Sequence, residues 1–137
     1  MKNINNIFVI DDDSITLFGL KKILSKLSPK TNVEDFKNGQ LAIDTIKEKL
    51  EQGQHLPEVI FLDINMPILD GWGFLKEFVE LQVKDKILIN IITSSIDPAD
   101  REQWLYYKER THHHIDFMTK PIYKLELSDL YKIDKAS

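Results

Sequence analysis

The chain has no cysteine among its 137 residues. This excludes a disulfide framework, a thiolate nucleophile and a metal site with cysteine ligands. Long apolar runs are absent too, since none approaches the roughly 18 residues that a membrane-spanning helix needs. The first residues lack the apolar centre of a signal peptide. We therefore expect a cytoplasmic protein that does not associate with membranes.

An excess of positive charge is also missing. The chain carries 18 basic and 22 acidic residues, for a formal net charge of −4, whereas nucleic-acid binding usually requires a basic stripe. We expect no nucleic-acid partner. The length and the apolar content of 42% fit one domain with a core of ordinary size. Residues 1–137 are therefore expected to form a single domain.

Short apolar runs alternate with amphipathic stretches along the chain. The runs have the length and composition of buried strands and cover residues 7–10, 31–36, 59–62, 87–92 and 115–118. Apolar residues at three- and four-residue spacing predict helices over residues 15–27, 41–50, 72–81, 98–107 and 125–130. Ser14 is the expected N-cap of the first helix. This alternation predicts an α/β fold in which helices cover both faces of a parallel sheet.

Polar side chains follow four of the predicted strands. Asp11 and Asp12 come directly after the first strand and Asp63 after the third. Thr93 follows the fourth strand, and Lys120 follows the fifth. Because ligand sites form at the carboxyl edge of an open parallel sheet, we expect these side chains to lie together on one rim.

Such a rim favours phosphoryl chemistry. Crowded carboxylates repel one another, and a hard divalent cation such as Mg²⁺ relieves that repulsion. Asp63 would then act as a nucleophile that forms an acyl phosphate, with Lys120 and Thr93 contacting the phosphate oxygens. Each residue also has an ordinary structural explanation. The acids would cap a helix, Thr93 would stabilise a turn, and Lys120 would lie in solvent.

Four motifs in this order resemble the receiver domain of two-component response regulators. The resemblance covers about residues 7–130, and the residues that carry it are Asp11-Asp12, Asp63-x-x-Met66-Pro67-x-x-Asp70-Gly71, Thr93-Ser94 and Lys120-Pro121. It implies a flavodoxin-like, doubly wound fold. In that fold a five-stranded parallel sheet has the order 2-1-3-4-5 and carries helices on both faces.

The resemblance also implies a role for each rim residue. Asp63 matches the phosphoacceptor. The Mg²⁺ ligands would be Asp11, Asp12, Asp63 and the backbone carbonyl of Asn65. Lys120 matches the lysine that pairs with the phosphate.

Two further residues match the family's switch. Thr93 corresponds to the hydroxyl that moves to contact the phosphoryl group, and Phe117 to the aromatic side chain that turns inward with it. Phe117 has no hydroxyl, whereas the family often has Tyr at this position. Whether the bond before Pro121 is cis, as it often is in the family, cannot be seen in the sequence.

The resemblance implies a stand-alone signalling protein similar to the single-domain chemotaxis regulators, without an output domain. It would accept its phosphoryl group from a sensor histidine kinase or a His-phosphotransfer protein and would signal by contacting another protein. It would catalyse only its own Mg²⁺-dependent phosphorylation and dephosphorylation. We expect a monomer or a weak dimer.

Other functions remain open at this point. One is a binding module that keeps the fold without being phosphorylated. Another is a Mg²⁺-dependent phosphohydrolase of the haloacid-dehalogenase type, but its Asp-x-Asp-x-Thr motif fails because Ile15 stands where Thr is expected after Asp11 and Asp13. A flavodoxin-like nucleotide-binding protein lacks support, since no glycine-rich loop follows any predicted strand.

Two stretches depart from the pattern. Residues 112–114 are three consecutive histidines; because adjacent side chains do not share one face, we interpret them as a loop before the fifth strand and not as a metal site. Residues 104–107, Trp-Leu-Tyr-Tyr, are either an exposed docking patch or part of the core.

Overall fold

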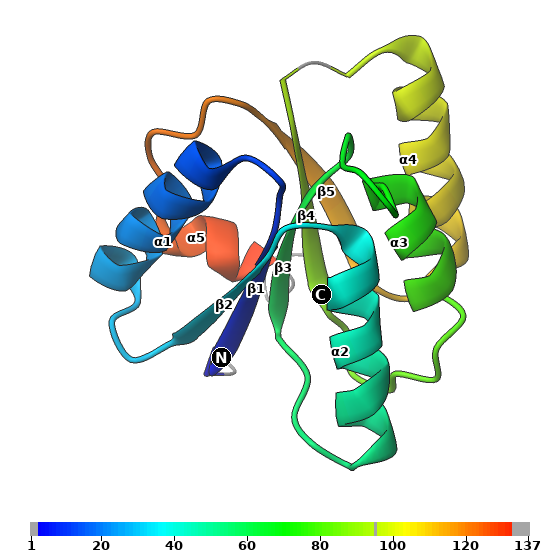
Figure 1. The fold of residues 1–137 in the computed structure, drawn as a ribbon, viewed down its shortest axis with the longest axis horizontal. Helices are drawn as coiled ribbons and strands as arrows, with labels where there is room; N and C mark the ends of the chain where they lie inside the picture. Colours follow the sequence, from blue (N-terminus) through cyan, green and yellow to red (C-terminus); the bar gives the residue numbers. More distant parts are fainter. Residues whose placement is uncertain (1–2, 95, 133–137) are drawn as a thin grey trace.

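Five parallel strands form the centre of the molecule (Figure 1). In the computed structural model, which describes residues 3–94 and 96–132, they lie in the order β2-β1-β3-β4-β5. The strands are β1 (Asn6–Ile10), β2 (Asn32–Phe36), β3 (Val59–Asp63), β4 (Leu88–Thr93) and β5 (His114–Thr119). All neighbouring pairs are parallel. The predicted fold class and strand order are confirmed.

Helices cover both faces of this sheet. They are α1 (Ser14–Leu27), α2 (Gly39–Glu51), α3 (Gly71–Phe78), α4 (Pro98–Arg110) and α5 (Leu127–Leu130). Figure 1 shows α1 and α5 on one side of the sheet and α2, α3 and α4 on the other. None of the helices in the described part of the chain is long and apolar enough to cross a membrane.

The two central strands explain why the apolar runs are continuous. In β3, Ile60 and Leu62 pack into the core layer that contains α2 and α3, whereas Val59 and Phe61 pack into the layer that contains α1. Every residue of β3 and β4 is buried. A strand with helices on both faces must be apolar at successive positions, which gives the uninterrupted runs of the sequence.

Several helix ends differ from the predicted ones. Asp13, not Ser14, is the N-cap of α1, because its carboxylate accepts hydrogen bonds from the backbone N–H of Ile15 at 3.1 Å and the hydroxyl of Thr16 at 2.8 Å. The last helix is shorter than predicted and begins at Leu127, where Glu126 N–H donates to the Asp129 carboxylate at 2.8 Å. Similarly, α3 ends at Phe78 because the chain turns directly afterwards.

Candidate functional site

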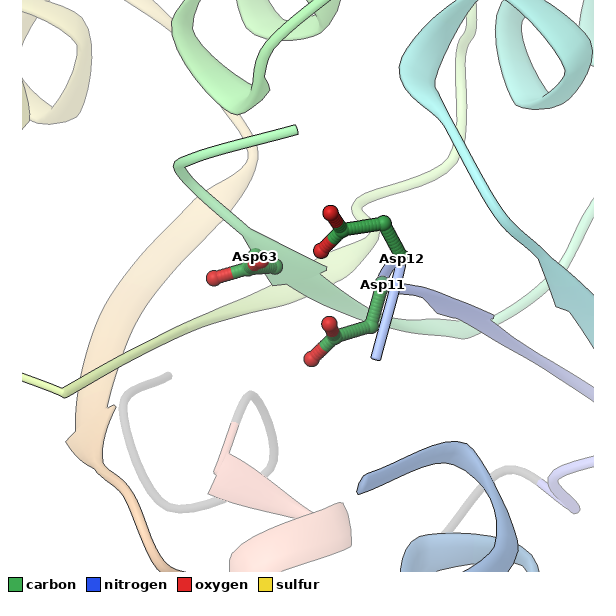
Figure 2. Close-up of side chains that lie close together, drawn as sticks. All are labelled: Asp11, Asp12 and Asp63. Atoms are coloured by element: carbon green, nitrogen blue, oxygen red, sulfur yellow. The ribbon is translucent and has the colours of Figure 1, made fainter. Parts of the chain in front are cut away.

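Three carboxylates meet at the carboxyl edge of the sheet. Asp11 and Asp12 follow β1, and Asp63 ends the adjacent strand β3. Each offers an oxygen atom, and these oxygens lie within 4.8 Å of one another. Asp11 and Asp63 are buried, whereas Asp12 is exposed. Figure 2 shows the three side chains around a common space, to which neighbouring strand ends bring residues far apart in sequence.

Lys120, directly after β5, brings a positive charge into this group. Its Nζ lies 2.8 Å from Oδ2 of Asp11 and 3.5 Å from Oδ1 of Asp63. Burial opposes the charge of Lys120, but the hydrogen bond and charge of Asp11 and the charge of Asp63 outweigh it and raise its pKa above the ordinary value. The peptide bond that follows Lys120 is cis.

The pKa of Asp63 is raised to about 6. Burial is the main cause, and the negative charge of Asp11 adds to it. Lys120 and the backbone N–H of Ile64 act in the opposite direction without cancelling the effect. Asp63 is therefore a carboxylate with uncompensated repulsion, and an added cation would relieve it.

The loop after β3 holds Asp63 closely. Gly71 packs against the backbone carbonyl of Asp63 so tightly that a Cβ atom at this position would clash with it. The Gly71 N–H donates to the carbonyl of Ile64 at 2.8 Å. Asp70 then caps α3 by accepting the N–H of Gly73 at 2.8 Å. The Asp-Gly pair of the motif thus joins Asp63 to the start of α3.

The predicted switch residues lie on β4 and β5. Thr93 ends β4 and is buried, and its carbonyl accepts the N–H of Lys120 at 2.7 Å. Phe117 is half-buried on the side of the sheet that faces α4, where its ring meets Trp104 edge-on at a centroid distance of 5.0 Å. Asn65 lies two residues after Asp63 and is exposed. The roles of these three residues stay predictions.

The histidine stretch is mainly structural. His114 belongs to β5, so the predicted loop ends one residue earlier than expected. His113 is buried, and its Nδ1 accepts the backbone N–H of Ile87 at 3.0 Å. Burial, and secondarily the neighbouring His112, lower the pKa of His113 to about 4. A neutral imidazole therefore satisfies a buried amide.

Residues 104–107 divide between partly buried and exposed side chains. Trp104 is partly buried, and its Nε1–H donates to the carbonyl of Ile115 at 3.0 Å. Tyr107 is also partly buried. Leu105 and Tyr106 are 42% and 52% exposed, so half of the stretch is surface. Trp104 and Tyr107 are three residues apart and therefore share one face of α4, which explains the pattern.

Two contacts of α4 were not predicted. Trp72 on α3 donates its Nε1–H to Oδ1 of Asp100 at 3.0 Å, and its ring stacks on Tyr107.

Beyond the rim, Lys132 binds Oδ1 of Asn90 at 3.0 Å and pairs with Asp116 at 3.2 Å. Asn90 inside an apolar run was the available signal for the contact with Lys132, since a buried amide needs a partner.

Comparison with known proteins identifies the family. The model of the response regulator receiver domain matches residues 7–132. The chain is 32% identical over 116 residues to a protein-glutamate methylesterase/protein-glutamine glutaminase of Archaeoglobus fulgidus, covering 84% of this chain and 29% of that protein. It is 29% identical over 85 residues to the chemotaxis protein CheY of Bacillus subtilis, covering 62% of this chain and 65% of that protein. The chain belongs to the receiver-domain family of response regulators.

Solved structures agree with this assignment. The crystal structure of a two-component response regulator from Cytophaga hutchinsonii has a TM-score of 0.79 and 26% identity, covering 99% of this chain and 100% of that one. The curated relatives are longer. The chain spans 29% of the Archaeoglobus protein and 38% of an uncharacterised response regulatory protein of Vibrio cholerae, less than two thirds of their length.

The residues present fit the Mg²⁺ that receiver domains bind at an acidic pocket. Carboxylate oxygens are the ligands this ion prefers, and three of them converge within 4.8 Å. The ammonium of Lys120 balances one of the three negative charges. Two negative charges of the cluster remain unbalanced, and the pKa of Asp63 is raised, first by burial and then by the charge of Asp11. The donor set and its charge both favour a divalent cation.

Proposed function

We propose that this chain is a phosphorylation-switched signalling protein and that Asp63 accepts the phosphoryl group. One observation carries the proposal: the carboxylate of Asp63 lies at the sheet edge beside two further acids and 3.5 Å from the ammonium of Lys120. In the receiver family this is the arrangement of the phosphoacceptor. The donor would be a sensor histidine kinase or a His-phosphotransfer protein, and the protein would work in the cytoplasm.

The reaction transfers a phosphoryl group between two side chains. A carboxylate oxygen of Asp63 attacks the phosphorus of a phosphohistidine on the donor. The new O–P bond replaces the N–P bond, and the imidazole nitrogen leaves with the bonding electron pair. The attacking group must be ionised, and with a pKa of about 6 Asp63 is mostly ionised at pH 7.

The other rim residues would bind and position the phosphoryl group. Mg²⁺, held by Asp11, Asp12, Asp63 and the carbonyl of Asn65, would neutralise negative charge on the phosphoryl oxygens. Lys120 already lies within 3.5 Å of Asp63, so its ammonium would pair with a phosphoryl oxygen. The chain would catalyse its own phosphorylation and dephosphorylation in this way and no other reaction.

The phosphorylation signal would be transmitted by a conformational change at the surface of the protein. The phosphoryl group adds about −1.5 to −2 charge, which gives Lys120 and Thr93 a new partner. Movement of Thr93 and Phe117 would bias the surface of α4, β5 and α5 between two arrangements. A downstream protein would bind one of them, and the chain itself would be a monomer or a weak dimer.

The test is the intact mass of the protein after incubation with Mg²⁺ and acetyl phosphate. We expect one added phosphoryl group on the wild type and none on Asp63→Asn. Excess EDTA should abolish the adduct because the acidic cluster then lacks its cation. An unmodified wild-type chain, together with unchanged NMR shifts in the presence of beryllofluoride and Mg²⁺, would support the phosphorylation-independent binding module instead.

A further inference from the structure

The attachment of α4 to the rest of the molecule is unusual. The helix has no fully buried residue, although the structure describes every residue of it. Aromatic contacts to two different elements help to hold it, in addition to hydrogen bonds from Trp72 to Asp100 and from Trp104 to the carbonyl of Ile115. Trp104 packs on Phe117 of β5, and Tyr107 stacks on Trp72 of α3 with a centroid distance of 6.3 Å and an interplanar angle of 11°. One contact therefore reaches the predicted switch strand, and the other reaches a different element.

Trp72 is close to the phosphoacceptor along the chain and in space. It follows Gly71, whose backbone leaves no room for a Cβ atom against the carbonyl of Asp63. The Gly71 N–H also donates to the carbonyl of Ile64 at 2.8 Å. Because Gly71 packs directly against this backbone, a shift of the backbone at Asp63 and Ile64 must also displace Trp72.

On its other side, Trp72 contacts α4 at two points. Its Nε1–H donates to Oδ1 of Asp100 at 3.0 Å, and its ring stacks on Tyr107. These residues are seven positions apart, about 10 Å along one face of the helix. The hydrogen bond to a carboxylate is of the stronger, charge-assisted kind. An indole that contacts two points along α4 constrains both the position and the tilt of that helix.

We propose that Trp72 is a positioning residue that couples the phosphoacceptor loop to α4 by a path separate from Thr93 and Phe117. This inference rests on the proposed function, because it concerns what happens when Asp63 is phosphorylated. A purely structural contact would stabilise α4 equally whether or not Asp63 carries a phosphoryl group. A coupling contact makes the position of α4 depend on the state of Asp63.

The experiment compares amide NMR spectra with and without beryllofluoride and Mg²⁺. Phe117→Ala removes the aromatic side chain of the predicted switch. In this variant we expect the amides of residues 104–108 still to shift when beryllofluoride is added. Adding Asp100→Ala should reduce these shifts at least two-fold, because the indole then loses its acceptor on α4. Asp100→Asn in the same background keeps a carbonyl acceptor and should preserve them.

Amides of residues 64–71 serve as the internal control, since they report binding at Asp63 directly. If they respond in Phe117→Ala while residues 104–108 do not, the separate path is wrong although the proposed function stands. Equal shifts in the Asp100→Ala and Asp100→Asn backgrounds would also overturn it. If residues 64–71 stay unchanged in the wild type, the proposed function fails and the coupling fails with it. Unchanged amides of β1 and β3 would show that each variant is folded.

Discussion

The surroundings of Asp63 disfavour its ionised form. Its pKa is raised to about 6 from an ordinary value of 3.8, first by burial and then by Asp11. A raised acid pKa means that the folded chain binds more protons than the unfolded chain between about pH 4 and pH 6. Stability therefore falls as the pH rises through this window, and the loss is complete above it.

Asp63→Asn should consequently stabilise the protein at pH 7 in EDTA. Asn cannot ionise, and Lys120 keeps its contact with Asp11 at 2.8 Å. A gain of about 1–3 kcal/mol in the free energy of unfolding is expected from the size of the pKa change, and it should disappear near pH 4. Urea unfolding at both pH values measures it. An equal gain at both values would show that charge is not the cause.

His113 behaves in the opposite way over nearly the same pH range. Burial, followed by the charge of His112, lowers its pKa to about 4 from 6.5. The unfolded chain then binds more protons than the folded chain between these values, so stability is lost as the pH falls from about 6.5 to about 4. Protonation of Nδ1 would in addition remove the acceptor for the N–H of Ile87.

Two substitutions separate the titration of His113 from its hydrogen bond. His113→Asn keeps an acceptor near Nδ1 and cannot titrate, so its stability relative to wild type should improve as the pH falls from 6.5 to 4. His113→Phe leaves the N–H of Ile87 buried without an acceptor, which should cost about 1–3 kcal/mol at pH 7. Thermal unfolding across this range tests both. Parallel pH curves for wild type and His113→Asn would exclude His113 as the titrating group.

At the scale of the elements, the turn between β3 and α3 is tightly constrained. A Cβ atom on Gly71 would overlap the backbone carbonyl of Asp63. Gly71→Ala must therefore move the loop that follows Asp63. We expect it to lower the free energy of unfolding by about 2 kcal/mol or more, as overpacking does, and to weaken beryllofluoride binding in the presence of Mg²⁺.

Gly19 provides the matched control. It lies in α1, and a Cβ atom there would meet nothing within 4 Å. Gly19→Ala should therefore stabilise the protein by about 0.5–1 kcal/mol, the difference between Gly and Ala inside a helix. Opposite signs for the two substitutions in the same urea titration are the expected result. A loss of stability in both would mean that the close approach at Gly71 is not the cause.

The elements also show what a sequence can predict. β3 and β4 were predictable because burial on both faces demands an uninterrupted apolar run. The rim followed from the rule that parallel strands end on one edge, which brings Asp11, Asp63 and Lys120 together. Helix ends were less certain because a cap depends on local backbone geometry; Asp13 and Ser14 are both good capping residues, and the structure uses Asp13.

Contacts between elements away from the carboxyl edge of the sheet were harder to predict from the sequence. The hydrogen bond from Trp72 to Asp100 joins residues 28 positions apart, and the bond from Ile87 to His113 spans 26. Neither has a repeating pattern, and each depends on the packing of two elements that are not adjacent in the chain. The histidine stretch is an example, because only the structure shows that His113 accepts a hydrogen bond from a backbone amide.

For the molecule as a whole, we expect the acidic site to link folding to metal binding. A ligand that binds only the folded chain stabilises it by an amount that grows with the logarithm of its concentration, about 2.7 kcal/mol at 100 times the dissociation constant. Mg²⁺ should bind only the folded chain, since folding brings Asp11 and Asp63 together from distant parts of the sequence. Adding Mg²⁺ should therefore raise the unfolding midpoint in urea, and EDTA should reverse this.

Asp12→Asn tests whether this stabilisation comes from the acidic cluster. Asp12 is exposed, so losing its charge should change the free energy of unfolding of the metal-free protein by less than about 0.5 kcal/mol. The same change removes one of the three converging carboxylates and should reduce the Mg²⁺-dependent gain by at least half. Asp44→Asn, an exposed acid on α2 outside the cluster, should keep the full gain. Equal Mg²⁺ stabilisation of all three proteins would place the bound ion elsewhere, because a carboxylate ligand cannot be removed from a site without weakening it.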